Sequence, residues 1–295
     1  MKSNKNFLAR FRGWIQAAAT LLTNIHIPNL LKGKIYQGNV KTMCVPGLNC
    51  YSCPAATGAC PIGAFQAVVG SSKFKFTYYI TGFFILLGVL LGRFICGFLC
   101  PFGWFQDLLH KIPGKKLSTA KLKPLRYLKY VILVIIVFMC YGGVYSKAQG
   151  TSPWDVFSMI HAGNFKLNGY LIGLVILVFL IVGMCLEERF FCRNFCPMGA
   201  VFSLVPVLPV FALRRDRESC IPKCSACSRK CPANIGLPTD SSWKVEGDCF
   251  QCQKCIDTCP KGNIRCGVKE LYGNEILFTL FRAVFLPTLL LWAGI

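Results

Sequence analysis

The sequence predicts a polytopic α-helical membrane protein that carries a cysteine-rich segment on its cytoplasmic side. The first observation is composition: 54% of the 295 residues are hydrophobic and the mean hydropathy is +0.50, which is typical of membrane proteins. The second is a formal net charge of +21, carried by Lys and Arg residues that mostly flank apolar segments. This placement indicates membrane anchoring rather than nucleic-acid binding. The third is a total of 19 cysteines, whose spacing indicates metal ligation more than disulfides.

Four apolar runs are long enough to be predicted spanning helices, at about 14–31, 74–95, 125–145 and 169–191. The first has no convincing cleavage site and is interpreted as an uncleaved anchor. Four Lys and Arg residues lie in 1–13 and seven in 92–127, against two in 146–168. Because cytoplasmic loops are enriched in Lys and Arg, the N-terminus and everything after residue 191 are expected in the cytoplasm of a cell inner-membrane protein.

This pattern divides the chain into three parts. Residues 1–213 form the predicted membrane domain, which includes an outer loop with four cysteines at 44–60. Residues 214–270 form a cysteine-rich cytoplasmic domain. Residues 271–295 form an apolar C-terminal helix, in which Arg282 and Pro287 leave open whether it crosses the membrane or lies on its surface.

The strongest motif lies at 249–260, where Cys-x₂-Cys-x₂-Cys-x₃-Cys-Pro matches the run of a bacterial two-cluster ferredoxin. A similar run begins at Cys220, with x₃ where x₂ is usual, which leaves the role of Cys220 open. In such ferredoxins the fourth cysteine of each run binds the other cluster. The sequence therefore predicts one 4Fe–4S cluster on Cys249, Cys252, Cys255 and Cys231, and another on Cys220, Cys224, Cys227 and Cys259. A zinc ribbon is the alternative.

A second motif, Arg-Phe-x-Cys-x₃-Cys-Pro-x-Gly, occurs twice, at 93–103 and 189–199. Proline cannot continue a helix but suits the first position of a new one, so each Cys-Pro pair predicts a helix break with cysteine at the N-cap. The free N–H groups there favour a thiolate. Together the copies predict one cluster or metal site, with a redox-active dithiol pair or simple packing as alternatives. Its cysteines are Cys96, Cys100, Cys192 and Cys196.

Arginines accompany both copies. Arg93, Arg189 and Arg193 are positioned either to balance the negative charge of a bound centre or to act as membrane anchors.

The outer loop contains a third Cys-Pro-x-Gly. Its four cysteines are Cys44, Cys50, Cys53 and Cys60. They predict a third cubane cluster, with two disulfides or a redox-active thiol pair as alternatives. The remaining Cys140, Cys185 and Cys266 are interpreted as small buried hydrophobic residues.

Two Cys-x₃-Cys-Pro motifs followed by a twin-cluster segment resemble the membrane polyferredoxins of the NapH/MauN type, 4Fe–4S binding membrane proteins. The pattern is similar in part to the iron–sulfur region of NosR and to CcoG. GKIYQG at 33–38 and SPWDVF at 152–157 support the resemblance, which covers the chain to about residue 270. It implies four spans, clusters on the cytoplasmic side, and electron transfer with the quinone pool or a redox partner. It also implies that the four repeat cysteines bind a cofactor or mediate electron transfer.

The predicted function is that of a membrane-integral electron-transfer subunit, which links the quinone pool or an exterior partner to a cytoplasmic redox partner. A hydrocarbon core of about 30 Å is too thick for useful single-step tunnelling, so the repeat cysteines would hold an intermediate carrier. A quinone site is considered near Gln16, His26 or His161. Alternatives are a maturation factor that reduces a metal or cofactor for a partner enzyme, and a structural scaffold. No catalytic residue or nucleotide-binding motif is found, so an enzyme assignment stays open.

Overall fold

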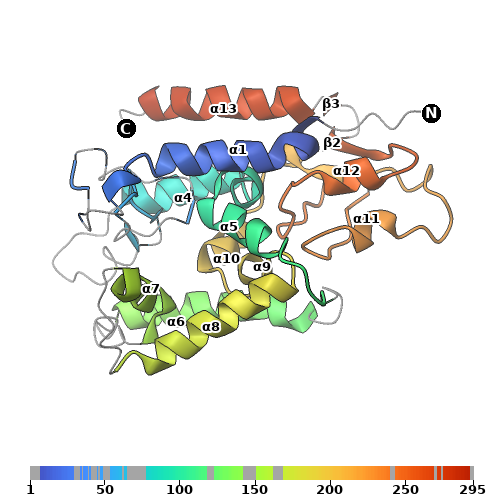
Figure 1. The fold of residues 1–295 in the computed structure, drawn as a ribbon. Coiled ribbons are helices and arrows are strands. Elements are labelled where there is room, and N and C mark those ends of the chain that lie inside the picture. The colour runs from blue at the N-terminus through green and yellow to red at the C-terminus, as the bar shows by residue number, and fades with distance from the viewer. Residues whose placement is uncertain are drawn as a thin grey trace.

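The computed structural model describes residues 7–29, 78–117, 123–141, 151–161, 169–239, 243–268, 271–273 and 275–292, together with parts of 34–64. Helix α1 (Phe7–Thr23) packs on α5 (Pro101–Leu109) and near α13 (Glu275–Trp292), and α1 and α13 run alongside each other in Figure 1. On the opposite side lie α6 (Leu128–Tyr141), α7 (Pro153–His161) and α8 (Leu171–Leu186). A cysteine-rich region with α11 (Ala226–Arg229) and α12 (Lys254–Thr258) occupies one end.

The first copy of the repeat breaks its helix as predicted. Helix α4 (Tyr78–Leu90) ends before Gly92, whose φ of +52° favours glycine, and the chain continues as the π-helix η2 (Ile95–Leu99). Cys100 then takes an extended conformation as the N-cap of α5, and Pro101 is its first residue. The prediction that proline starts a new helix here is confirmed.

The second copy repeats this geometry. After α8 the chain turns at Arg189, with φ of +60°, into the short helix α9 (Phe190–Asn194). Cys196 is the N-cap of α10 (Pro197–Leu204), and its sulfur accepts a hydrogen bond from the Gly199 N–H at 3.3 Å. The cap predicted from Cys-Pro is therefore confirmed here too.

The predicted membrane architecture is not what the structure shows. Among the described residues, no helix is at once long and apolar enough to cross a bilayer. The longest apolar helix of the repeats, α8, has 16 residues and so rises about 24 Å, against a hydrocarbon core of about 30 Å. The predicted span at 74–95 is divided by the break at Gly92. The prediction of a polytopic fold with four spanning helices is therefore wrong: the described helices of the four runs, α1, α4, α6 and α8, have only 13 to 17 residues, and two of the runs are interrupted where the repeats begin.

The ferredoxin-like region is built on a small antiparallel sheet of order β1-β2-β3, from β1 (Leu213–Arg215), β2 (Ile264–Val268) and β3 (Leu271–Gly273). Two 3₁₀ turns, η3 (Lys123–Tyr127) and η5 (Pro209–Phe211), precede α6 and β1. Cys266 is buried in β2 opposite Leu213, which confirms its interpretation as a small buried residue. Cys185 is half-buried in α8.

The core joins the repeats to the ferredoxin-like region. Buried aromatic and aliphatic side chains from α4, η2, α8, α9 and α10 form one cluster, and Phe250 and Cys252 of the ferredoxin run belong to it. The cysteine-rich region is therefore packed onto the repeats rather than tethered as a separate unit.

Candidate functional site

Six cysteines from two separate runs line one cavity of about 230 Å³. Its lining includes Cys231 together with Cys249, Cys252 and Cys255, the set that the crossed ferredoxin pattern predicts. Burial, followed by the neighbouring Cys231, raises the pKa of Cys249, and burial with the nearby cysteines raises the pKa of Cys255. Such crowded thiols are held as thiolates only when metal ions supply positive charge, so this donor set fits an iron–sulfur cluster.

A second, narrower cavity adjoins the first and is lined by the other predicted set, Cys220, Cys224, Cys227 and Cys259. Arg215 lines both cavities, and its Nη1 lies 3.8 Å from the Cys227 sulfur. Within the longer spacer of this run, Lys223 takes a left-handed conformation, with φ of +59°. Cys220 therefore reaches the site despite the irregular spacing, and the donor set again fits a cluster. In the described part of the chain, no three His, Cys, Asp or Glu side chains are grouped closely enough to hold a single metal ion.

The repeat cysteines form a third group. Cys96, Cys100, Cys192 and Cys196 are each at most 4% exposed. Burial, together with Cys192 and Cys96, raises the pKa of Cys100 to about 12, and the same causes raise the pKa of Cys196. The four thiols are thus near enough to interact electrostatically. That they bind a centre stays a prediction.

The arginine of each copy hydrogen-bonds to the backbone of the other copy, a contact that the sequence did not predict. The Arg93 guanidinium donates to the Cys192 carbonyl of the second copy, and Arg189 donates to the Cys96 carbonyl of the first. Both arginines are 1% exposed, so neither reaches toward the surface as a membrane anchor. Arg193 is also buried and pairs with Glu187.

The glycine that ends each motif makes this contact possible. A Cβ atom on Gly103 would collide with Nη1 of Arg189, and one on Gly199 would lie 2.9 Å from Nη2 of Arg93. The arginine of each copy therefore passes over the glycine of the other. This pseudo-twofold contact explains why the motif carries both residue types.

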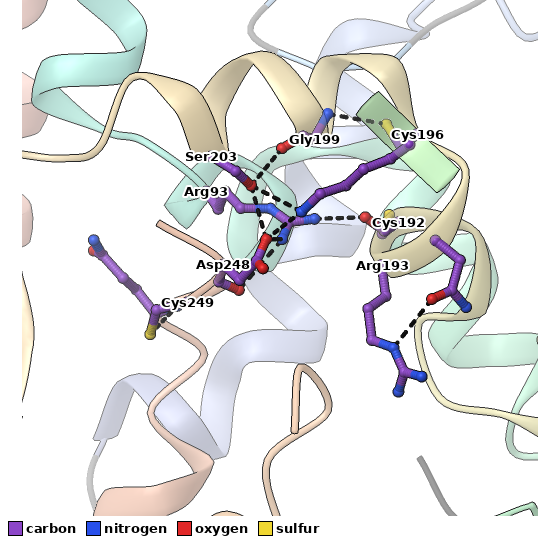
Figure 2. Close-up of polar contacts among 11 residues, drawn as sticks. Arg93, Cys192, Arg193, Cys196, Gly199, Ser203, Asp248 and Cys249 are labelled. Atoms are coloured by element: carbon purple, nitrogen blue, oxygen red, sulfur yellow. Dashed lines mark hydrogen bonds and ion pairs between the residues drawn. The ribbon is translucent and has the colours of Figure 1, made fainter. Parts of the chain in front are cut away.

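Asp248, beside Cys249 of the ferredoxin run, is the centre of a buried polar network, which Figure 2 shows. Its carboxylate accepts from Arg93 Nη1 at 2.9 Å and from Ser203 Oγ at 2.8 Å, and it also pairs with the Lys129 ammonium. Burial alone would raise the pKa of Asp248, but Arg93 and Lys129 outweigh it and hold that pKa below its ordinary value. The network joins α6, α10 and the first repeat to the ferredoxin run.

Two further polar residues on α5 support the repeat cysteines. Gln106 Nε2 donates to the Cys192 sulfur at 2.9 Å, while its Oε1 accepts from the Phe191 N–H at 3.1 Å. Asp107 accepts from Arg189 at 2.7 and 2.9 Å and from Arg12 at 2.8 Å. Polar side chains in an apolar setting were the only sequence signal for either residue.

The ferredoxin run touches the first repeat directly. Arg93 lies 4.3 Å above the Phe250 ring. A Cβ atom on Gly97 would lie 2.5 Å from the Phe250 carbonyl oxygen and 3.9 Å from the Cys252 Cα. Gly97, the residue after Cys96, therefore lies against the backbone of Phe250 and Cys252, which belong to the other predicted set.

The outer-loop prediction falls largely outside the described residues, where Cys44, Cys50 and Cys53 lie. Cys60 is half-buried. The loop nonetheless reaches the repeat, because the Leu48 N–H lies 3.4 Å from the Cys100 sulfur.

The three residues considered for a quinone differ in setting. Gln16 of α1 is fully buried, and its amide has no hydrogen-bond partner among the described residues. His26 stacks on Tyr36 with ring centroids 3.8 Å apart, and His161 is the last residue of α7.

Comparison with known proteins agrees with these motifs. The chain matches a 4Fe-4S binding domain family at residues 58–79, 76–119 and 171–215, which include both copies of the repeat. An uncharacterised protein of Methanocaldococcus jannaschii is 31% identical over 186 residues, 60% of this chain and 73% of that protein. The ferredoxin-type protein NapH of Escherichia coli is 27% identical over 212 residues, 68% of this chain and 71% of NapH.

The putative electron transport protein YccM of Escherichia coli is 30% identical over 189 residues, 60% of this chain, which spans 51% of the length of YccM. No solved structure matches. The matching domain and the named relatives identify the chain as an iron–sulfur protein, and the clustered cysteines agree with this. The chain belongs to the ferredoxin-type family of 4Fe–4S electron-transport proteins that includes NapH.

Proposed function

We propose that this protein is an electron-transfer subunit that passes electrons through three iron–sulfur centres in series. The order of the cysteine sets supports this route. The Cys220 set adjoins the Cys231 set, because Cys224 and Cys227 line both cavities. The contact of Gly97 with Phe250 and Cys252 then brings the Cys231 set to the repeat cysteines. This contact is the observation that carries the proposal.

The chain's own residues would hold and tune the centres. When bound, a 4Fe–4S cluster accepts and releases single electrons. Hydrogen bonds to the ligating sulfurs raise its reduction potential, and the described residues supply several. The Gln251 N–H lies 3.4 Å from the Cys249 sulfur, Gln106 donates to Cys192, and the Gly199 N–H donates to Cys196. Packing around Phe250 keeps water from the contact between centres.

The ends of the route are further proposals. Buried Gln16, with an unsatisfied amide, is suited to donate to a quinone carbonyl. The loop that touches Cys100 is suited to deliver electrons from an exterior partner.

We also propose that the protein associates with membrane lipid, with its N-terminus and ferredoxin-like region on the cytoplasmic side. Helix α8 exposes a row of large apolar side chains, which a monomeric soluble protein rarely does. These are Leu171, Ile172, Val175, Phe179 and Val182. The exposed basic residues Arg10, Lys111, Lys115 and Lys116 would face anionic headgroups.

Counting iron tests the route. After anaerobic purification, three centres should give about twelve iron and twelve sulfide per chain, or about sixteen of each if loop 44–60 also binds a cluster. The C96S/C196S variant should lose about four of each. Cys185→Ser lies outside all the sets and serves as the matched control, with an unchanged count. If the wild-type protein contained about eight iron, the repeat centre would be excluded, and absence of iron would refute the proposed function altogether.

A further inference from the structure

The cavity of the Cys220 set opens on an exposed rim that no part of the proposed route uses. Cys224 is exposed, whereas Cys252 of the neighbouring set is buried. Ile221, Pro222 and Pro260 are exposed beside it, and Ile221 and Pro260 line the same cavity as the four cysteines. This set is therefore the surface terminus of the three, with an apolar patch next to its most exposed ligand.

Lysines border that patch. Lys223 is one of the three residues of the longer spacer in the first run, directly precedes Cys224 and takes a left-handed conformation. Lys261 follows Pro260 and lines the cavity. Both are exposed. The longer spacer thus carries a lysine at the exposed rim, while Cys220 still lines the cavity.

Other charges nearby reinforce the basic character. Arg217, Arg229 and Lys230 are exposed in the same segment, and none of these five cations forms an ion pair with another described residue. Two acidic residues lie in 216–231. Asp216 accepts a hydrogen bond from the Ser219 hydroxyl and lies near Arg265, and Glu218 is exposed. The surface around Cys224 therefore keeps a clear positive excess.

We propose that this rim, formed by Ile221, Pro222, Lys223, Pro260 and Lys261 around Cys224, is the docking surface for a small acidic electron-carrier protein. An apolar centre with a charged border is the usual anatomy of a protein interface. Complementary charge speeds encounter and orients the partner, as a short-lived electron-transfer complex requires. In the complex one electron leaves the reduced carrier and one enters the site of the Cys220 set, with no bond made or broken. The inference rests on the proposed function.

The test measures binding separately from electron transfer. The probe is an oxidised, strongly acidic two-cluster ferredoxin, titrated onto the iron-loaded full chain by calorimetry at low and high salt. The K223E/K261E variant should weaken binding at low salt by at least about tenfold and flatten its salt dependence. Reduction of the chain by the reduced carrier should slow in parallel. Lys115→Glu reverses the charge of an exposed lysine in the turn after α5, and it should change neither the binding affinity nor the rate of reduction.

Iron content and reduction by dithionite verify that the variant is intact. If the iron-loaded wild type bound a basic c-type cytochrome equally well, or if K223E/K261E bound the acidic carrier like the wild type, the docking surface would be refuted while the proposed function stood. A chain without iron would refute the proposed function instead.

Discussion

Replacement of Asp248 by asparagine is expected to lower the free energy of unfolding by about 3–5 kcal/mol, because it leaves buried cations without a counter-charge. The side chains of Arg93 and Lys129 are both 0% exposed, and Asp248 is the carboxylate that both contact. Asparagine keeps the shape and one acceptor oxygen, so the loss reports charge rather than packing. Denaturant unfolding of the iron-loaded protein measures it.

Glu218→Gln removes a negative charge from an exposed position and is the matched control, with an expected change within about 0.5 kcal/mol. Equal stabilities for D248N and E218Q would mean that the buried network contributes nothing. Because Asp248 adjoins Cys249, the EPR spectrum of the nearest centre should also change in D248N and stay the same in E218Q.

Gly97→Ala is expected to separate the ferredoxin run from the first repeat. The new methyl group would lie 2.5 Å from the Phe250 carbonyl, a backbone atom that moves only with the run itself. Overpacking of this kind costs about 1–3 kcal/mol. The larger consequence concerns electron transfer: the magnetic interaction between the reduced centres on either side of the contact should weaken, and transfer between them should slow.

Gly114→Ala provides the comparison, since nothing lies within 4 Å of its added Cβ. Its stability and EPR spectra should match those of the wild type. If G97A kept both the magnetic interaction and the transfer rate, the contact of Gly97 with Phe250 and Cys252 would not be the route between centres.

Short-range chemistry made much of the site predictable. The crossed assignment of Cys231 and Cys259 follows from ferredoxin spacing and stays a prediction; Cys231 lines the first cavity beside Cys249, and Cys259 lines the second beside Cys220. The helix breaks at Cys100 and Cys196 follow from proline, which acts on its own backbone neighbours. Neither inference needs knowledge of distant residues.

The membrane prediction failed for a related reason. Hydropathy counts apolar residues in a run, but a helix crosses a bilayer only if it continues unbroken over about 20 residues. The turns at Gly92 and Arg189 lie at tertiary contacts, because Gly92 packs against Val207 and Arg189 donates to Asp107 and to the Cys96 carbonyl, and hydropathy along the sequence does not reveal them.

By itself the sequence determined the iron–sulfur family and the repeat of Cys-Pro caps, because these depend on local spacing and backbone preference, and it predicts the two ferredoxin quartets on the same ground. Only the tertiary structure decided which charges compensate one another and which segments touch. Lys129 and Asp248 are 119 residues apart, and Gln106 and Cys192 are 86 apart. Such pairs form only when burial makes an unpaired charge or amide costly, and burial is a property of the packed chain.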